Sequence, residues 1–146
     1  MKGIIIGGGI GGLTTALRFQ QLGLDFEVFE QATAFQPVGA GIVLAENALG
    51  VYRRLGIDAA IRAAGLPFQA AAILNQSLQP ISRLIDGQSE SVAIHRAALH
   101  RVLLEHLPEK SIRLSKQLVS VEEVDDGLCC LFEDGTEAVG DFVIGA

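Results

Sequence analysis

The beginning of the chain changes from an apolar run into a helical pattern. Residues 4–6 are consecutive isoleucines and predict a buried strand, and the glycine-rich residues 7–12 predict a tight turn after it. Leu13, Ala16 and Leu17 then fall at the spacing of one helix face, so we expect a helix from Leu13 that ends at Gly23. Residues 26–30 predict a second strand. The segment is therefore typical of the strand–helix–strand unit of an α/β fold.

The rest of the chain alternates short helical and strand-like patterns. We expect a loop at 31–41, helices at 46–55 and 58–64, and strands at 68–75 and 80–85. A stronger helix begins near Arg96 and ends at Pro108, with an apolar stripe that consists of Leu99, Val102, Leu103 and Leu107. Strand-like segments follow at 111–114, 118–124, 128–133 and 137–146, and Asp-Gly turns join the last three as hairpins.

The last segment has a different pattern from the others. Residues 142–146 are apolar without interruption, which is typical of a strand buried on both faces of a parallel sheet. Open α/β sheets bind ligands just beyond the carboxyl ends of their strands. We therefore expect the sequence to stop where a functional loop begins, so that the fold is truncated after its last parallel strand.

The glycine-rich turn carries candidate chemistry. Gly7, Gly9 and Gly12 have the spacing G-x-G-x-x-G, in which the first glycine makes the turn, the second lets backbone approach a pyrophosphate, and the third lets helix and strand pack closely. Glu30 ends the second strand about 20 residues later, where this fingerprint expects an acid for ribose hydroxyls. The competing interpretation is an ordinary glycine-rich loop followed by an unrelated surface glutamate.

Composition narrows the class of protein. The 146 residues are 49% apolar and 19% charged, which is typical of one well-buried α/β domain. The net charge of −6 and the scattered lysines and arginines argue against a nucleic-acid surface, and no segment resembles a signal peptide or membrane span. Cys129 and Cys130 are neighbours that point to opposite faces of a strand, so they form neither a disulfide nor a metal site together. We expect a cytoplasmic location.

Other candidate sites are weaker. His95, His100 and His106 are five and six residues apart, so they do not share a helix face for metal binding. The acidic residues at 122–126 are interpreted as a solvated hairpin end. No serine or cysteine lies in a nucleophile elbow, and no catalytic side chain is assigned.

Taken together, these motifs resemble the single-component FAD-dependent aromatic hydroxylases, the family that includes salicylate and 3-hydroxybenzoate hydroxylases. The matching stretches are residues 4–16, 29–31 with 38–44, 96–103 (the pattern R-x-x-L-x-x-x-L), and 134–135 with 141–146. The resemblance extends over the whole chain. It implies a Rossmann-like FAD-binding fold of the glutathione reductase type, with a parallel sheet and a β-meander.

The resemblance also implies a set of cofactor-binding residues. Gly7, Gly9 and Gly12 would approach the FAD pyrophosphate, and Glu30 would accept hydrogen bonds from the adenosine ribose. Arg96 would lie near the phosphates and the ribityl chain, which agrees with the suitability of a guanidinium at a helix start for a diphosphate; a solvated helix-terminal arginine is the alternative. The full set is Gly7, Gly9, Ile10, Gly11, Gly12, Glu30, Gln31, Gly41, Ile42, Arg96 and Leu118.

Two of these assignments have a plain structural alternative. Leu118 matches the position whose backbone meets the adenine, but a leucine there is equally explained as strand core. The loop Gly39-Ala40-Gly41-Ile42 resembles the segment beside the isoalloxazine ring and substrate, where glycines let backbone contact a flat ring. A plain flexible turn is the competing interpretation.

The family's function implies an FAD-binding portion of a monooxygenase that uses NAD(P)H and O2 to hydroxylate a small aromatic substrate. The sequence departs from the family at Glu46, where a proline is common, and it ends before the family's Asp-Gly and Gly-Asp motifs. We therefore expect residues 1–146 to form the N-terminal part of an FAD/NAD(P)-binding domain that is inactive alone. Residues 68–85 would begin the substrate-domain sheet.

Two other functions stay open at the level of sequence. One is another FAD-dependent oxidoreductase on the same fold, such as an epoxidase or an amine oxidase, although the Arg-rich stretch of amine oxidases is absent after the second strand. The other is a non-catalytic nucleotide-binding remnant. An exposed apolar strand edge would also allow the chain to associate with itself.

Overall fold

The computed structural model describes residues 1–36, 39–85 and 90–146, and it divides into two compact units. The first unit comprises Met1–Val38 and Leu99–Ala146, and the second comprises Gly39–Ala98. Helix α4 (Arg96–Glu105) begins in the second unit and continues in the first. Pro37, Val38 and the expected turn at Asp86-Gly87 lie outside the described residues.

The first unit is built on a parallel sheet with the strand order β12-β1-β2-β8. The strands are β1 (Lys2–Ile6), β2 (Asp25–Phe29), β8 (Ile112–Arg113) and β12 (Phe142–Gly145), and all their pairings are parallel. In register, Ile4 lies opposite Val143 on one side and Glu27 on the other. The α/β fold with a parallel sheet is therefore confirmed.

The expected strand at 137–146 is two strands in the structure. β11 (Glu137–Gly140) and β12 are separated at Asp141, whose N–H donates to the carbonyl of Lys2 at 2.8 Å and directs the chain from one sheet into the other. The prediction that the last strand is buried on both faces is wrong. Residues Phe142, Val143 and Ile144 are half-buried, because β12 lies at the edge of its sheet.

Helix α1 (Ile10–Gln21) covers one face of this sheet through Leu13, Ala16 and Leu17, all of which are buried. It begins three residues before the expected Leu13, inside the glycine run, because tertiary packing outweighs the low helix propensity of glycine there. Its end follows the prediction: Gly23 has φ +68°, and hydrogen bonds from Gly23 and Leu24 close the last turn.

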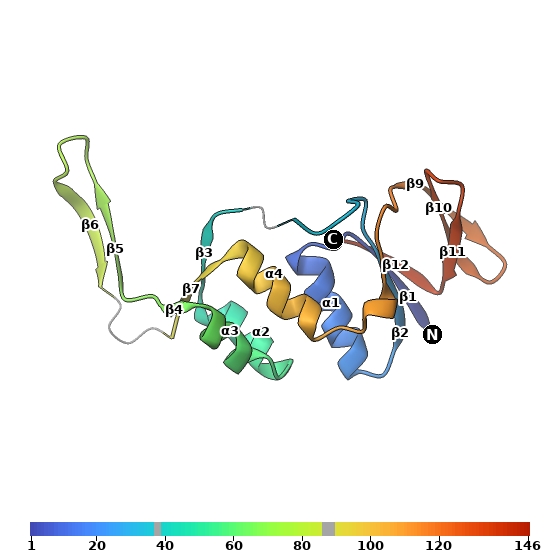
Figure 1. Cartoon of the computed structure of the whole chain (residues 1–146), viewed down its shortest axis with the longest axis horizontal. Coiled ribbons are helices and arrows are strands. Elements are labelled where there is room, and N and C mark those ends of the chain that lie inside the picture. The colour runs from blue at the N-terminus through green and yellow to red at the C-terminus, as the bar shows by residue number, and fades with distance from the viewer. Residues whose placement is uncertain (37–38, 86–89) are drawn as a thin grey trace. The chain divides into compact units, whose positions relative to one another are not determined.

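A β-meander covers the opposite face of the sheet (Figure 1). Antiparallel strands β9 (Leu118–Val124), β10 (Gly127–Phe132) and β11 form it, and the Asp-Gly turns join them as predicted. Buried Ile4 and Phe29 from the sheet pack against Cys130 and Phe132 from the meander. The two phenylalanine rings are stacked, with their centroids 4.6 Å apart. Alternation along β1 therefore sends Ile4 toward the meander and Ile5 toward α1.

Ion pairs at Glu27 tie together neighbouring strands of the parallel sheet. The Glu27 carboxylate lies 2.7 Å from Lys2 Nζ and 3.1 Å from Arg113 Nη2, so it links β2 to β1 and to β8. Partial burial raises the pKa of Glu27, but the hydrogen bonds and charges of Lys2 and Arg113 outweigh that effect and lower the pKa below its ordinary value. The carboxylate therefore stays ionised between the strands.

The stripe expected on α4 is buried, as predicted. Its residues Leu99, Val102 and Leu103 and the following Leu107 are at most 8% exposed. The chain then passes through a short 3-10 helix (Glu109–Ser111) into β8. These contacts anchor α4 in the first unit.

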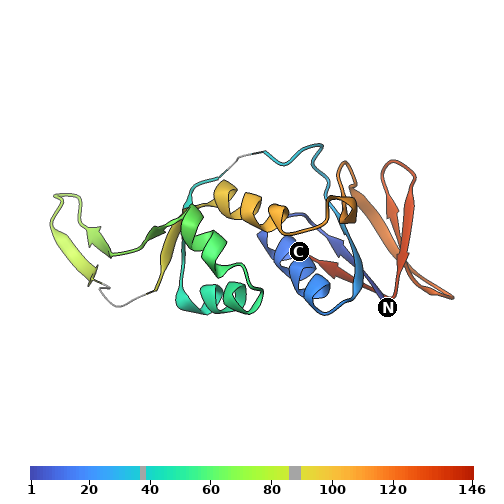
Figure 2. The ribbon, with the colours of Figure 1, turned by 60° about the horizontal axis from the view of Figure 1, so that its bottom comes forward.

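The second unit combines short antiparallel strands with two helices. Strands β3 (Gly41–Leu44), β7 (Val92–His95) and β4 (Leu66–Pro67) form a sheet in the order β3-β7-β4. Helices α2 (Glu46–Arg54) and α3 (Asp58–Ala64) follow β3, and Gly56, with φ +79°, separates them as expected. Strands β5 (Ala70–Leu74) and β6 (Pro80–Ile85) form a hairpin near the predicted positions (Figure 2).

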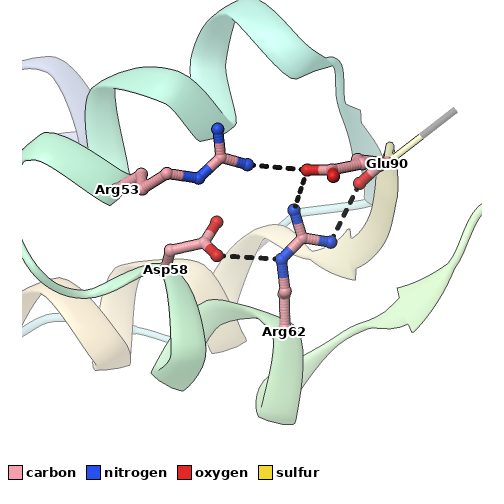
Figure 3. A network of polar contacts seen from close by, with 4 residues as sticks. All are labelled: Arg53, Asp58, Arg62 and Glu90. Carbon is pink, nitrogen blue, oxygen red and sulfur yellow. Dashed lines mark hydrogen bonds and ion pairs between the residues drawn. The ribbon is translucent and has the colours of Figure 1, made fainter.

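A polar network holds the start of β7 against the two helices (Figure 3). Glu90 accepts hydrogen bonds from Arg53 on α2 at 2.6 Å and from Arg62 on α3 at 3.1 Å, and Arg62 also pairs with Asp58 at 2.9 Å. Charge is balanced within the network, because two arginines face two carboxylates. Its role here is structural: it fixes the chain where it enters β7.

Candidate functional site

The glycine-rich turn after β1 leaves no room for side chains at two positions. A Cβ at Gly12 would lie 1.9 Å from the carbonyl oxygen of Gly7, and a Cβ at Gly7 would lie 2.1 Å from the carbonyl oxygen of Ala146. Gly7 also has φ +113°, a conformation that favours glycine. The first and third glycines of the fingerprint are therefore fixed by close backbone packing, as their spacing predicted.

The second glycine faces open space. Among the described residues, no heavy atom beyond the adjoining residues and the backbone of the helix itself lies within 4 Å of a Cβ built at Gly9 or Gly11. Gly9 is the N-cap residue of α1 and offers no side-chain cap, so the first amides of the helix, beginning at Ile10, have no acceptor in the described part of the turn. Free N–H groups and the positive end of a helix dipole make this turn suitable for an anion such as a pyrophosphate.

Glu30 is fixed at the end of β2, beside the turn. Its Oε2 accepts a hydrogen bond from the N–H of Gly8 at 2.7 Å, and its Oε1 accepts one from the N–H of Ala32 at 2.8 Å. Its own backbone is held by Arg113 and Lys116. Each carboxylate oxygen keeps a second lone pair, so the side chain can also accept hydrogen bonds from ribose hydroxyls.

A cleft of about 490 Å³ brings these elements together. Five predicted residues line it, namely Gly7, Gly9, Glu30, Gln31 and Leu118. The predicted Ile10, Gly11 and Gly12 form the first turn of α1 directly after Gly9. The free amides of the turn suit a pyrophosphate, and the Glu30 carboxylate suits the hydroxyls of a ribose. The cleft therefore suits the dinucleotide that the sequence predicted.

The cleft also contains residues that the sequence did not single out. Lys116 lies on its wall with its ammonium hydrogen-bonded to Asp134 and, at 2.7 Å, to Thr136 Oγ1. Hydrogen bonds from Lys116 and Thr136 lower the pKa of Asp134 to about 2. The sequence carries no signal for Lys116, because its place in the cleft depends on the turn between β8 and β9 meeting the meander. Gln117, Ile6 and Phe29 also line the cleft.

The remaining predicted residues, Gly41, Ile42 and Arg96, lie in the unit of residues 39–98. There Gly41 and Ile42 belong to β3 rather than to a loop, and they pair with His95 and Ile94 of β7. The N–H of Arg96 donates to the carbonyl of Ala40 at 3.1 Å. This pairing corrects the expectation of a loop through Ile42.

Gly39 is the glycine of this segment that a close contact requires. Its φ is +132°, and a Cβ there would lie 3.0 Å from Cδ of Arg96. The aliphatic part of the arginine therefore packs on the glycine backbone, while the side chain as a whole is exposed. The structure thus brings together the glycine segment and the arginine that the sequence had placed in separate motifs.

The histidines and cysteines have individual environments. His95 Nδ1 accepts a hydrogen bond from the N–H of Ala97, and His106 Nδ1 contacts the carbonyl of Val102 at 2.7 Å. Burial raises the pKa of the Cys130 thiol, which lies in the core beneath the meander. Among the described residues, no group of three or more histidine, cysteine, aspartate or glutamate side chains is arranged to hold a metal ion.

Within the described ranges, no helix has the length and apolar character needed to cross a membrane.

Comparison with known proteins identifies the family of the chain. The family model described as "FAD binding domain" matches residues 1–146. The aurachin C monooxygenase/isomerase of Stigmatella aurantiaca is 36% identical over 149 residues, which cover 98% of this chain and 39% of that protein. The FAD-dependent urate hydroxylase of Klebsiella pneumoniae is 33% identical over 153 residues, which cover 100% of this chain and 40% of that protein.

Solved structures show the same fold. The structure of Klebsiella pneumoniae HpxO complexed with FAD and uric acid matches with a TM-score of 0.85 and 29% identity, covering 98% of this chain and 38% of that chain. FqzB matches with a TM-score of 0.86 and 25% identity, covering 100% of this chain and 36% of that one. The chain thus spans well under half the length of the proteins that it matches. The family match over residues 1–146 shows that this chain belongs to the FAD binding domain family, and its cofactor is FAD.

Proposed function

We propose that this chain is the FAD-binding portion of a monooxygenase that hydroxylates a small aromatic substrate with NAD(P)H and O2. The observation that carries the proposal is the cleft in which Gly7, Gly9, Glu30 and Leu118 meet beside the first turn of α1. Relatives support the reaction class: besides the urate hydroxylase, a 3-amino-4-hydroxybenzoate 2-monooxygenase of Streptomyces cremeus is 38% identical over 152 residues, covering 97% of this chain and 38% of its own.

Each part of the cleft has a role in this proposal. The amides around Gly9 and the first turn of α1 bind the FAD pyrophosphate, and Glu30 accepts hydrogen bonds from the adenosine ribose. Gln31 and the backbone of Leu118 contact the adenosine end. When bound, FAD supplies the redox chemistry, and the protein supplies binding, orientation and exclusion of water.

The second unit contributes the remaining proposed contacts. The aliphatic part of Arg96 packs on Gly39, which leaves the guanidinium to hydrogen-bond the phosphates and ribityl chain of FAD. Gly41 and Ile42, on the strand paired with β7, approach the flavin ring and the substrate. We also propose that the β5–β6 hairpin begins the substrate-domain sheet, as the positions 68–85 predicted.

A cytoplasmic location belongs to the same proposal. Cys129 and Cys130 are both free thiols and cannot pair with each other as neighbours on one strand. Free thiols are typical of a reducing compartment. Nucleic-acid or membrane partners are not part of the proposal.

The test is a titration of the purified chain with FAD, followed by the quenching of flavin fluorescence and by the absorption spectrum. We expect saturable binding with one equivalent of FAD and a rise in the melting temperature, since ligand at about 100 times its Kd stabilises a protein by about 2.7 kcal/mol. Absence of binding would overturn the proposal and favour a non-catalytic remnant. Binding of FAD followed by oxidation of an amine, without NAD(P)H, would instead favour the amine-oxidase alternative.

A further inference from the structure

Gly8 lies between Gly7 and Gly9, outside the fingerprint spacing, and side chains hydrogen-bond both its N–H and its carbonyl oxygen. Its N–H donates to Glu30 Oε2 at 2.7 Å, and its carbonyl oxygen lies 2.7 Å from Nε2 of His100 on α4. The Phe35 ring packs beside His100 and Gly8: its centroid lies 4.8 Å from that of the imidazole, and a Cβ at Gly8 would be 2.9 Å from its Cε1. All of these residues belong to the first unit.

The chemistry of the contact fixes the proton on the imidazole. A carbonyl oxygen only accepts hydrogen bonds, so Nε2 of His100 must be the donor and carry a hydrogen. This holds for the neutral Nε2–H tautomer and for the imidazolium alike. The His100 side chain is half-buried, which limits competition from water for the carbonyl.

The contact orients the amide that faces the cleft. The carbonyl of Gly8 and the N–H of Gly9 belong to one peptide group, and the described peptide bonds are trans. In a trans peptide these groups point in opposite directions, so the hydrogen bond to His100 turns the Gly9 N–H away from α4. Gly9 lines the cleft, and its N–H has no acceptor among the described residues.

The other peptide group of Gly8 is held as well. Its N–H is bonded to Glu30, while the carbonyl of the same peptide, that of Gly7, packs against Gly12 at the start of α1. Both peptide groups that flank Gly8 are thus fixed before a ligand arrives. A preorganised donor loses less conformational entropy on binding than a free one.

We propose that His100 is a positioning residue of the nucleotide-binding turn, which holds the Gly8–Gly9 peptide so that the Gly9 N–H faces the pyrophosphate. The inference rests on the proposed function, because the pyrophosphate is that of FAD. His100 itself does not touch the cofactor. It acts through one peptide group, and its effect is on affinity for any ligand that carries this pyrophosphate, including ADP.

The experiment compares variants of His100 in the full chain. His100→Leu removes the donor at similar size, whereas His100→Gln offers an amide N–H that reaches nearly as far. We expect His100→Leu to weaken the binding of FAD and of ADP by a similar factor, about tenfold. His100→Gln should restore most of the affinity. His106→Leu is the matched control on the same stretch of chain, since His106 contacts Val102 rather than the turn, and should leave both affinities unchanged.

A spectroscopic readout separates positioning from general stability. In the wild-type chain, ADP should shift the amide proton resonance of Gly9, and His100→Leu should abolish or reverse that shift while the melting temperature without ligand changes little. If His100→Leu fails to fold, His100→Asn is used as the variant without the hydrogen bond, because its amide is too short to reach Gly8. Its affinities are then compared with those of His100→Gln. Equal affinity in the donor and non-donor variants would overturn the inference. A wild-type chain that binds neither FAD nor ADP would overturn the proposed function itself.

Discussion

Gly9 and Gly12 occupy the same turn, but different forces exclude a side chain at each. At Gly12 the obstacle is the protein's own backbone, 1.9 Å from a built Cβ, whereas at Gly9 the space is open and φ is −74°. An alanine can adopt that φ without strain. In this interpretation the ligand, not the fold, requires glycine at position 9.

The two alanine substitutions should therefore have opposite signatures. Gly9→Ala should fold with a melting temperature close to that of the wild type but bind FAD at least tenfold more weakly, because its methyl group meets the pyrophosphate. Gly12→Ala should lower the stability by about 1–3 kcal/mol or more, because overpacking forces the backbone of Gly7 to move. Thermal unfolding and FAD titration of both variants check this, and a Gly9→Ala variant with full affinity would contradict it.

Glu30 offers a second test at the scale of one residue. In Glu30→Gln the side-chain NH2 faces the N–H of either Gly8 or Ala32, so one of the two hydrogen bonds becomes a clash of donors. We expect FAD affinity to fall about tenfold to a hundredfold, consistent with the loss of a charged hydrogen-bond acceptor. Glu123→Gln, on exposed β9, is the matched control. Fluorescence titration measures the FAD affinity of both variants. Equal affinities of Glu30→Gln and Glu123→Gln would show that Glu30 does not bind the cofactor.

At the scale of elements, the sequence predicted the features that depend on neighbouring residues. It did not predict the pairing of strands that lie far apart in the chain. The Asp-Gly turns at 126–127 and 134–135 sit where the meander turns, because such turns are specified by neighbouring residues. Strands β3 and β7 were missed: each has four residues, and about 50 residues separate the partners Gly41 and His95. No local pattern encodes a pairing over that distance.

The same limit applied to the candidate site. Gly7, Gly9 and Glu30 were found because a strand–turn–helix–strand unit fixes their spacing. The contacts of His100 with Gly8 and of Arg96 with Gly39 join segments that are far apart in the chain, so only the structure reveals them.

The meander carries a testable pH dependence. Lys116 and Thr136 lower the pKa of Asp134 to about 2 from an ordinary value of 3.8, so the folded state holds the proton more weakly than the unfolded state. The resulting stabilisation is complete above pH 3.8 and is lost as the pH falls from 3.8 toward 2. The difference in melting temperature between the wild type and Asp134→Asn should therefore shrink across this window.

The control for this measurement lies in the preceding hairpin turn. Asp126 makes no ion pair within the described part of the chain, so Asp126→Asn should show no comparable change over the same range. A constant difference between the wild type and Asp134→Asn from pH 5 to pH 2 would show that the ion pair contributes nothing.

At the scale of the whole molecule, apolar side chains are exposed on the β5–β6 hairpin. Ile73, Leu78 and Ile81 are 64%, 77% and 69% exposed, and side chains of this kind on a two-stranded hairpin favour association. We expect the chain to self-associate as its concentration rises, and Ile73→Ser with Ile81→Ser to reduce that association. Sedimentation velocity over a concentration series is the measurement.

A matched surface change on the meander gives the comparison. Val119 on β9 is 60% exposed, so Val119→Ser removes a similar apolar group from a different sheet. Equal association of this variant and the hairpin variant would show that the hairpin is not the contact surface. Edge pairing through β12 would then be the alternative to test.

The contact between Gly7 and Ala146 also determines when the turn can be completed during synthesis of the chain. Ala146 donates its N–H to the carbonyl of Ile6, and its own carbonyl packs on Gly7, so the turn is closed by a residue 139 positions later in the chain. A ribosome that adds about 5–20 residues per second needs on the order of ten seconds to cover that distance. During this interval the first strand and helix can form without their last neighbour. The nascent chain therefore completes its cofactor turn only after the meander has been made.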